Sequence, residues 1–145
     1  MQQPTISLKP LKTRADIELL VNRFYDKLLA DERIGYMFAH IVGSHWQKHL
    51  EKMYRFWESN IFDSDSYQGN PMLQHIKLHK RQAMSTEMFN LWLAYWQQTV
   101  NELFIGEKAE KALFRAATIK DLMQQRVLTD ELPHFMQRIR SNINQ

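Results

Sequence analysis

The histidines of this sequence are the side chains best suited to chemistry, because the chain contains no cysteine. The six of them are His40, His45, His49, His75, His79 and His134. Two pairs, His45 with His49 and His75 with His79, are four residues apart, a spacing that places both imidazoles on one helix face and can supply two metal ligands. The same spacing also arises by chance on solvated helices. Metal ligation and incidental surface positions therefore both remain open.

Two of the histidines share faces with apolar residues. His49 precedes Met53 by four residues and Phe56 by seven, so all three lie on the inward face of an expected helix. His75 directly precedes Ile76 on a second, shorter apolar segment. Two imidazoles that point inward from different helices indicate a pocket with imidazole on opposing sides, and a flat cofactor would fit such a pocket.

Iron porphyrin meets this requirement physically. The metal needs an axial nitrogen, which a neutral imidazole supplies, and the apolar macrocycle must lie between hydrophobic side chains to avoid water. The side chains that could form these walls are Phe38, Met53, Phe56, Trp57, Phe89 and Trp92. Ordinary core packing would produce the same spacing, so periodicity alone does not distinguish a haem wall from a core.

Several other functions are excluded or disfavoured. The glycines, at positions 35, 43, 69 and 106, are too far apart for a P-loop or a G-x-G-x-x-G turn, and neither G-x-S-x-G nor H-E-x-x-H occurs. The net charge of +3 arises from 19 basic and 16 acidic residues spread along the chain, so we expect no nucleic-acid partner. The N-terminus lacks a signal-peptide pattern, and the longest apolar run, 91–96, is too short for a bilayer. We therefore expect a cytoplasmic protein that does not bind membranes.

The composition predicts an all-α fold. The chain has 145 residues, the size of one domain, with only four glycines and four prolines, and no segment alternates with period two. Capping signals and apolar spacing predict helices that start after Thr13, with Asp16 as its capping-box partner, and after Ser44. The expected helical segments are 13–30, a short turn at 31–38, 44–61, 71–79, 85–106, 107–127 and 133–143.

The chain divides into three expected parts. Residues 1–12 form an arm, 13–127 form the domain, and 128–145 form a tail that contains the last short helix. The apolar side of that helix would cover the domain or form a dimer contact. The pattern is therefore compatible with a monomer or a homodimer.

Several strings in the chain resemble the group III truncated haemoglobins. They include Trp46-Gln-Lys-His49, the Y-x-G-N-P-x-x-x-H-x-x-L string that runs from Tyr67 through His75 to Leu78, and the F-x-x-W-L string at 89–93. The resemblance covers roughly residues 13–127. It implies a shortened globin fold, a two-over-two helical sandwich around haem.

Position by position, the resemblance implies the roles of particular residues. His75 falls on the proximal iron ligand, and Tyr25, His49 and Trp92 fall on the distal ligand-binding residues, with His49 also able to act as a sixth iron ligand. The resemblance places Phe38 on the porphyrin and Met53, Phe56 and Trp57 along the distal side; Phe89 is the further wall residue. His79, Lys80 and Arg81 have the right charge to contact the haem propionates, although a solvated basic run explains them equally well.

The resemblance implies haem b as cofactor and a diatomic gas, such as oxygen, nitric oxide or carbon monoxide, as ligand. Tyr and Trp offer hydrogen-bond donors, and a bond to a charged group contributes about 1.5–3 kcal/mol, or roughly 10- to 150-fold in affinity. Tight retention suits sensing, scavenging or redox turnover better than oxygen delivery. Nitric oxide dioxygenation or peroxide chemistry would need a separate reductase, because the chain has no flavin or nicotinamide motif.

Two other interpretations compete with a haem protein. In the first, His45, His49, His75 and His79 hold zinc or iron without porphyrin. In the second, the chain is a helical interaction module without a cofactor, and its histidines are incidental.

Overall fold

The computed structural model describes residues 7–38, 45–63 and 85–131, and its side chains as far as residue 125. The elements are α1 (Arg14–Ala30), α2 (Glu32–Gly35), the 3-10 helix η1 (Tyr36–Phe38), α3 (Trp46–Phe62), α5 (Thr86–Leu103) and α6 (Glu107–Glu131). Among these residues the one extended pairing is an isolated parallel bridge between Lys9 and Phe104. The all-α prediction is confirmed.

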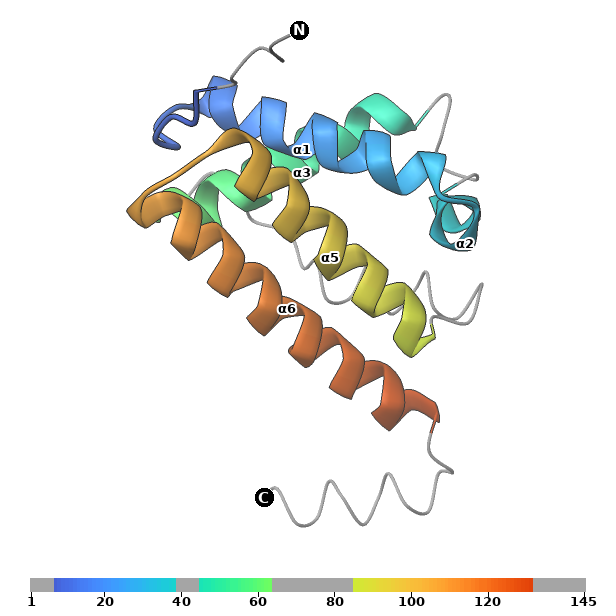
Figure 1. Cartoon of the computed structure of the whole chain (residues 1–145). Coiled ribbons are helices and arrows are strands. Elements are labelled where there is room, and N and C mark those ends of the chain that lie inside the picture. The colour runs from blue at the N-terminus through green and yellow to red at the C-terminus, as the bar shows by residue number, and fades with distance from the viewer. Residues whose placement is uncertain (1–6, 39–44, 64–84, 132–145) are drawn as a thin grey trace, which may run out of the picture.

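The long helices form two pairs (Figure 1). Helix α1 packs against α3, and α5 packs against α6. The pairs are joined by contacts of α1 with α5 and of α3 with α6. This is the two-over-two arrangement that we expected from the sequence.

Helix α1 begins as its capping signals predict. The Thr13 side chain accepts a hydrogen bond from the Asp16 backbone N–H at 3.2 Å, and the Asp16 carboxylate accepts from the Thr13 N–H at 3.1 Å. The carboxylate also pairs with Lys9 at 2.8 Å. Burial raises the pKa of Asp16, but the bonds from Lys9, Lys12 and Thr13 together lower it further, so the pKa lies below its usual value.

The bounds of the other long helices differ in part from the prediction. Ser85 caps α5 through a bond from the Met88 N–H, as expected, whereas α3 has His45 at its N-cap without a side-chain cap. Ser44, the predicted cap, lies outside the described residues. Helix α5 ends at Leu103, before the left-handed Gly106, whose φ is 105°.

Helix α6 is longer than predicted. It continues to Glu131 instead of ending near Val127, because Thr129 and Asp130 did not stop it. Residues 132–145 lie outside the described part of the chain. The expected helices 71–79 and 133–143 lie outside the described residues.

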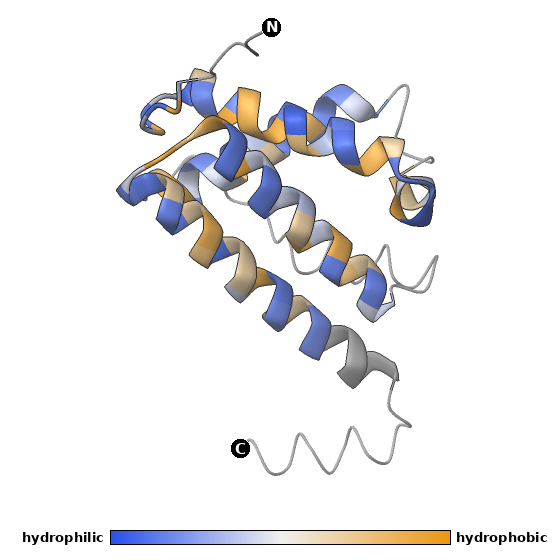
Figure 2. Cartoon of the chain, in the orientation of Figure 1, coloured by the Kyte–Doolittle hydropathy of each residue, from blue (hydrophilic) through white to orange (hydrophobic). Residues whose placement is uncertain are grey.

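The core lies between the two helix pairs and takes residues from all the long helices. Apolar and polar residues follow one another along each of these helices (Figure 2). Trp96 of α5 is fully buried, stacks on Trp57 of α3 with ring centroids 4.0 Å apart, and donates from its indole N–H to the Ala112 carbonyl of α6. One pair of rings thus joins three helices. None of the described helices is long and apolar enough to cross a membrane.

The first residues of the described chain pack on this domain. Leu11 is 1% exposed, and the Lys9 carbonyl accepts a hydrogen bond from the Ile105 N–H at 3.0 Å. The part of the arm nearest the domain is therefore fixed to the turn between α5 and α6.

Candidate functional site

Tyr25 and His49 meet between α1 and α3. The Tyr25 hydroxyl lies 2.8 Å from His49 Nε2, within hydrogen-bond distance. Tyr25 is 6% exposed and His49 is half-buried. Two of the predicted distal residues are thus in direct contact inside the protein.

Aromatic side chains surround this pair. The Phe38 ring at the end of η1 lies 5.8 Å from the Tyr25 ring and 6.4 Å from the His49 ring, measured between centroids. Trp46, in the first turn of α3, stacks on His49 at 5.3 Å and meets Tyr25 edge-on at 5.1 Å. The two polar groups therefore lie among apolar surfaces, where a hydrogen bond is stronger than in water.

Trp92, the third predicted distal residue, lies on α5 and is half-buried. Its ring contacts Phe24 at 5.9 Å and stacks on Trp57 at 6.4 Å. Phe24 in turn meets Tyr25 at 5.2 Å, so one phenyl ring connects Trp92 to the Tyr25–His49 pair.

The predicted wall residues fall into two groups. Met53, Phe56 and Trp57 belong to the main core, with Phe56 and Trp57 buried and Met53 partly buried. Phe89 belongs to a second cluster between α5 and α6, where it packs with Met123. Trp92 also packs against this second cluster, and it therefore lies where the two clusters meet.

The Tyr25 hydroxyl is protonated at neutral pH, and its burial reinforces this state. Desolvation raises the pKa of the hydroxyl well above its ordinary value, so Tyr25 keeps its proton at neutral pH. When His49 Nε2 carries no proton, Tyr25 donates to it; when Nε2 carries a proton, His49 donates and the Tyr25 proton is available to another acceptor. When His49 Nε2 carries the proton, the Tyr25 hydroxyl can therefore donate a hydrogen bond to a ligand.

The remaining predicted site residues are outside the described part of the chain. These are His75, His79, Lys80 and Arg81. Their roles as iron ligand and propionate contacts remain predictions. Within the described residues no three His, Cys, Asp or Glu side chains come together as a metal site.

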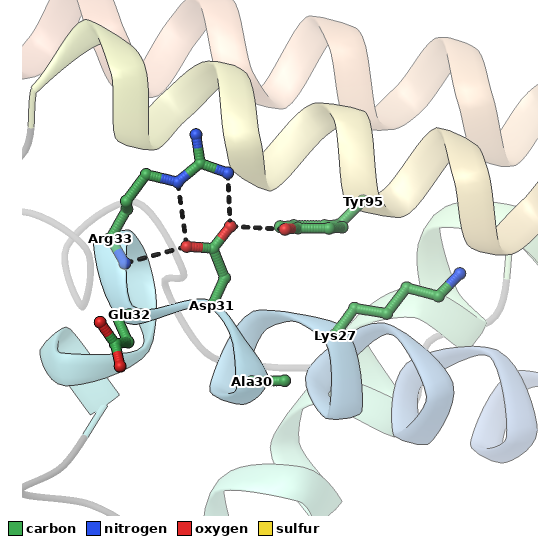
Figure 3. Close-up of a pocket in the computed structure, with 6 residues that line it drawn as sticks. All are labelled: Lys27, Ala30, Asp31, Glu32, Arg33 and Tyr95. Atoms are coloured by element: carbon green, nitrogen blue, oxygen red, sulfur yellow. Dashed lines mark hydrogen bonds and ion pairs between the residues drawn. The ribbon is translucent and has the colours of Figure 1, made fainter.

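Sequence reasoning did not identify two features near the site. Trp46 was recognised only as part of a motif, although its position three residues before His49 places both rings on one helix face. The second feature is a shallow surface pocket of about 540 Å³ that contains Asp31, Arg33 and Tyr95 (Figure 3). Asp31 and Tyr95 come from distant parts of the sequence, and no local pattern connects them.

Comparisons with known proteins identify the family of the chain. Residues 11–139 match the model of the bacterial-like globin family. A curated relative, the group 3 truncated hemoglobin ctb of Campylobacter jejuni, is 27% identical over 111 residues, which cover 74% of this chain and 85% of the relative.

Solved structures show the same fold. The crystal structure of group III truncated hemoglobin from Campylobacter jejuni has a TM-score of 0.71 at 25% identity, covering 88% of this chain and 95% of that one. Chlamydomonas reinhardtii THB1 has a TM-score of 0.63 at 22% identity, covering 83% of this chain and 98% of that one. The resemblance to the group III truncated haemoglobins is thereby confirmed.

Proposed function

The chain belongs to the bacterial-like globin family, and from this premise we propose that it binds haem b and retains a diatomic gas tightly beside Tyr25 and His49. Globins bind haem, and the iron of the haem is the atom to which a diatomic gas binds. Our proposal adds three points for this chain: the haem is haem b, His75 is the proximal iron ligand, and the gas is retained tightly.

The observation that carries the proposal is the 2.8 Å contact between Tyr25 and His49 inside aromatic walls. The buried Tyr25 hydroxyl needs a hydrogen-bond partner, and here that partner is an imidazole that lies among aromatic rings. Phe38 and Trp46 supply flat apolar surfaces of the kind that keep a porphyrin from water. The described half of the site therefore fits the distal side of a haem.

The polar pair supports tight retention. Haem iron would supply electron density to a bound gas, and a hydrogen-bond donor beside the gas would stabilise the negative charge that it gains. Tyr25 has a proton to give, because a tyrosine hydroxyl is neutral at pH 7 and burial raises its pKa further. The oxygen of that hydroxyl can at the same time accept a hydrogen bond from His49 Nε2. Trp92, one ring away, offers an indole N–H as a further donor.

Tight retention favours sensing, scavenging or redox turnover over oxygen delivery. Turnover of nitric oxide or peroxide would require electrons from a separate reductase. His49 has a second role to test, because its Nε2 could bind the iron directly when no gas is present. A monomer and a homodimer are both compatible with the described residues.

One set of absorption spectra tests the proposal. The purified protein is measured oxidised, reduced and under carbon monoxide, together with its iron content. We expect a Soret band that shifts when carbon monoxide binds to the reduced protein. Bound zinc or iron without a Soret band would instead support the histidine metal site, and the absence of both would support the helical interaction module.

A further inference from the structure

The bend that follows α1 is held together by one residue. The Asp31 backbone N–H donates to the Leu28 carbonyl at the end of α1, and the Asp31 carboxylate accepts from the Arg33 N–H at the start of α2. The Asp31 carbonyl accepts from the Ile34 and Gly35 N–H groups at 3.2 and 2.7 Å. We call residues 31–38 the corner.

The corner cannot shift toward α1. A Cβ atom added at Gly35 would lie 2.9 Å from the Leu29 carbonyl oxygen and 3.0 Å from that of Leu28, so the backbones already touch. If the corner loosens, it must therefore move away from α1. Side-chain contacts with α5 oppose such a movement.

Tyr95 provides such a contact from α5. Its hydroxyl donates to the Asp31 carboxylate at 2.5 Å, and Arg33 donates to the same carboxylate from Nε and from a terminal nitrogen at 3.1 and 2.8 Å (Figure 3). The Asp31 side chain is only 9% exposed. Hydrogen bonds from Arg33 and Tyr95 hold the pKa of Asp31 far below its usual range, so the carboxylate stays charged.

The far end of the corner reaches the ligand site. Met37 and Phe38 are 1% and 7% exposed, and Phe38 contacts both Tyr25 and His49. A corner that moves away from α5 would therefore carry Phe38 away from this pair. Other contacts of the corner with α5, from Arg33 to Glu87 at 3.6 Å and from Tyr36 to the Met88 sulfur at 3.9 Å, are longer.

We propose that Tyr95 is a positioning residue for the Tyr25–His49 site. Through its bond to Asp31 it fixes the corner to α5, and the corner in turn keeps Phe38 against the two polar residues. The expected change in gas binding rests on the proposed function. The expected loosening of the corner and the displacement of Tyr25 and His49 do not depend on it.

The test compares Tyr95→Phe with Tyr54→Phe in the full haem-loaded chain. Tyr54 is a matched control, because its hydroxyl also donates at 2.5 Å between helices, from α3 to Asn22 of α1, and lies outside the corner. In Tyr95→Phe we expect amide exchange at Ile34 and Gly35 to rise about two- to tenfold. We also expect shifted NMR signals from the His49 ring and gas dissociation that is faster by up to about tenfold.

The outcomes separate the two proposals. Faster corner exchange with unchanged His49 signals, or equal effects of both variants, would overturn the positioning role. If the protein holds no haem, the proposed function fails, while amide exchange and the His49 signals still decide the role of Tyr95. If Tyr95→Phe does not fold, Asp31→Asn is measured beside Arg33→Ala, because both variants weaken the bonds between Arg33 and residue 31 and Asp31→Asn also weakens the bond from Tyr95. Equal effects of these two variants would then overturn the positioning role.

Discussion

Replacing Tyr25 with Phe removes a hydroxyl from the proposed ligand site and leaves the ring in place. Tyr25 is 6% exposed, so water has little access to replace the lost donor. A hydrogen bond to a charged acceptor contributes about 1.5–3 kcal/mol, which corresponds to roughly 10- to 150-fold in dissociation rate. His49 loses its 2.8 Å partner and can turn toward the ligand, which offsets part of the loss. We therefore expect oxygen dissociation to accelerate about 10- to 30-fold, the lower part of this range.

Stopped-flow spectroscopy measures this rate directly. The reduced, oxygen-loaded protein is mixed with excess carbon monoxide, and the change of the Soret band gives the dissociation rate. Tyr54→Phe is the control, because it removes a tyrosine hydroxyl that bonds to Asn22 away from the ligand site. The double variant Tyr25→Phe/His49→Leu shows how much of the loss His49 offsets.

An unchanged dissociation rate in Tyr25→Phe, with full haem content, would refute the reasoning. The Tyr25 proton would then be committed to His49 even in the gas-bound protein. Slower dissociation would also refute it, because the hydroxyl would then be crowding the ligand instead of stabilising it.

Three further predictions concern the fold and the cofactor. His75→Ala should lose haem during gel filtration and regain it with added imidazole; full haem retention without imidazole would remove His75 as the axial ligand. Because the pKa of Asp16 is lowered in the folded protein, its contribution to stability is complete above its ordinary pKa of 3.8 and is lost as pH falls through the lower, folded value. Urea unfolding of Asp16→Asn across this pH range should accordingly show a weaker acid dependence than the wild type. Gly35→Ala should lower the free energy of unfolding by about 1–3 kcal/mol in the same assay, since its Cβ would meet backbone oxygens, and an unchanged value would mean that the corner can yield.

Local signals in the sequence predicted the starts of helices well. Thr13 and Ser85 cap α1 and α5 because a capping bond closes within a few residues and depends little on the rest of the fold. The end of α6 was less predictable. Thr129 and Asp130 have only a weak preference against helix, so they did not end α6 where the sequence pattern predicted.

The candidate site could be predicted only in part. Periodicity indicated that His49 faces inward, and the family resemblance supplied Tyr25, but the hydrogen bond between them depends on how α1 crosses α3. The bond between Tyr95 and Asp31 joins residues 64 positions apart and leaves no spacing pattern in the sequence. His75 was assigned by the resemblance and remains a prediction.

The stacked indoles of Trp57 and Trp96 give the protein an internal optical reporter. Two nearly parallel rings, 4.0 Å apart and inclined by 21°, couple their electronic transitions and should produce a circular dichroism signal that separated indoles lack. The rings belong to α3 and α5, so this signal exists only when the two helix layers have met. The moment at which the layers assemble during refolding is therefore visible without any attached dye.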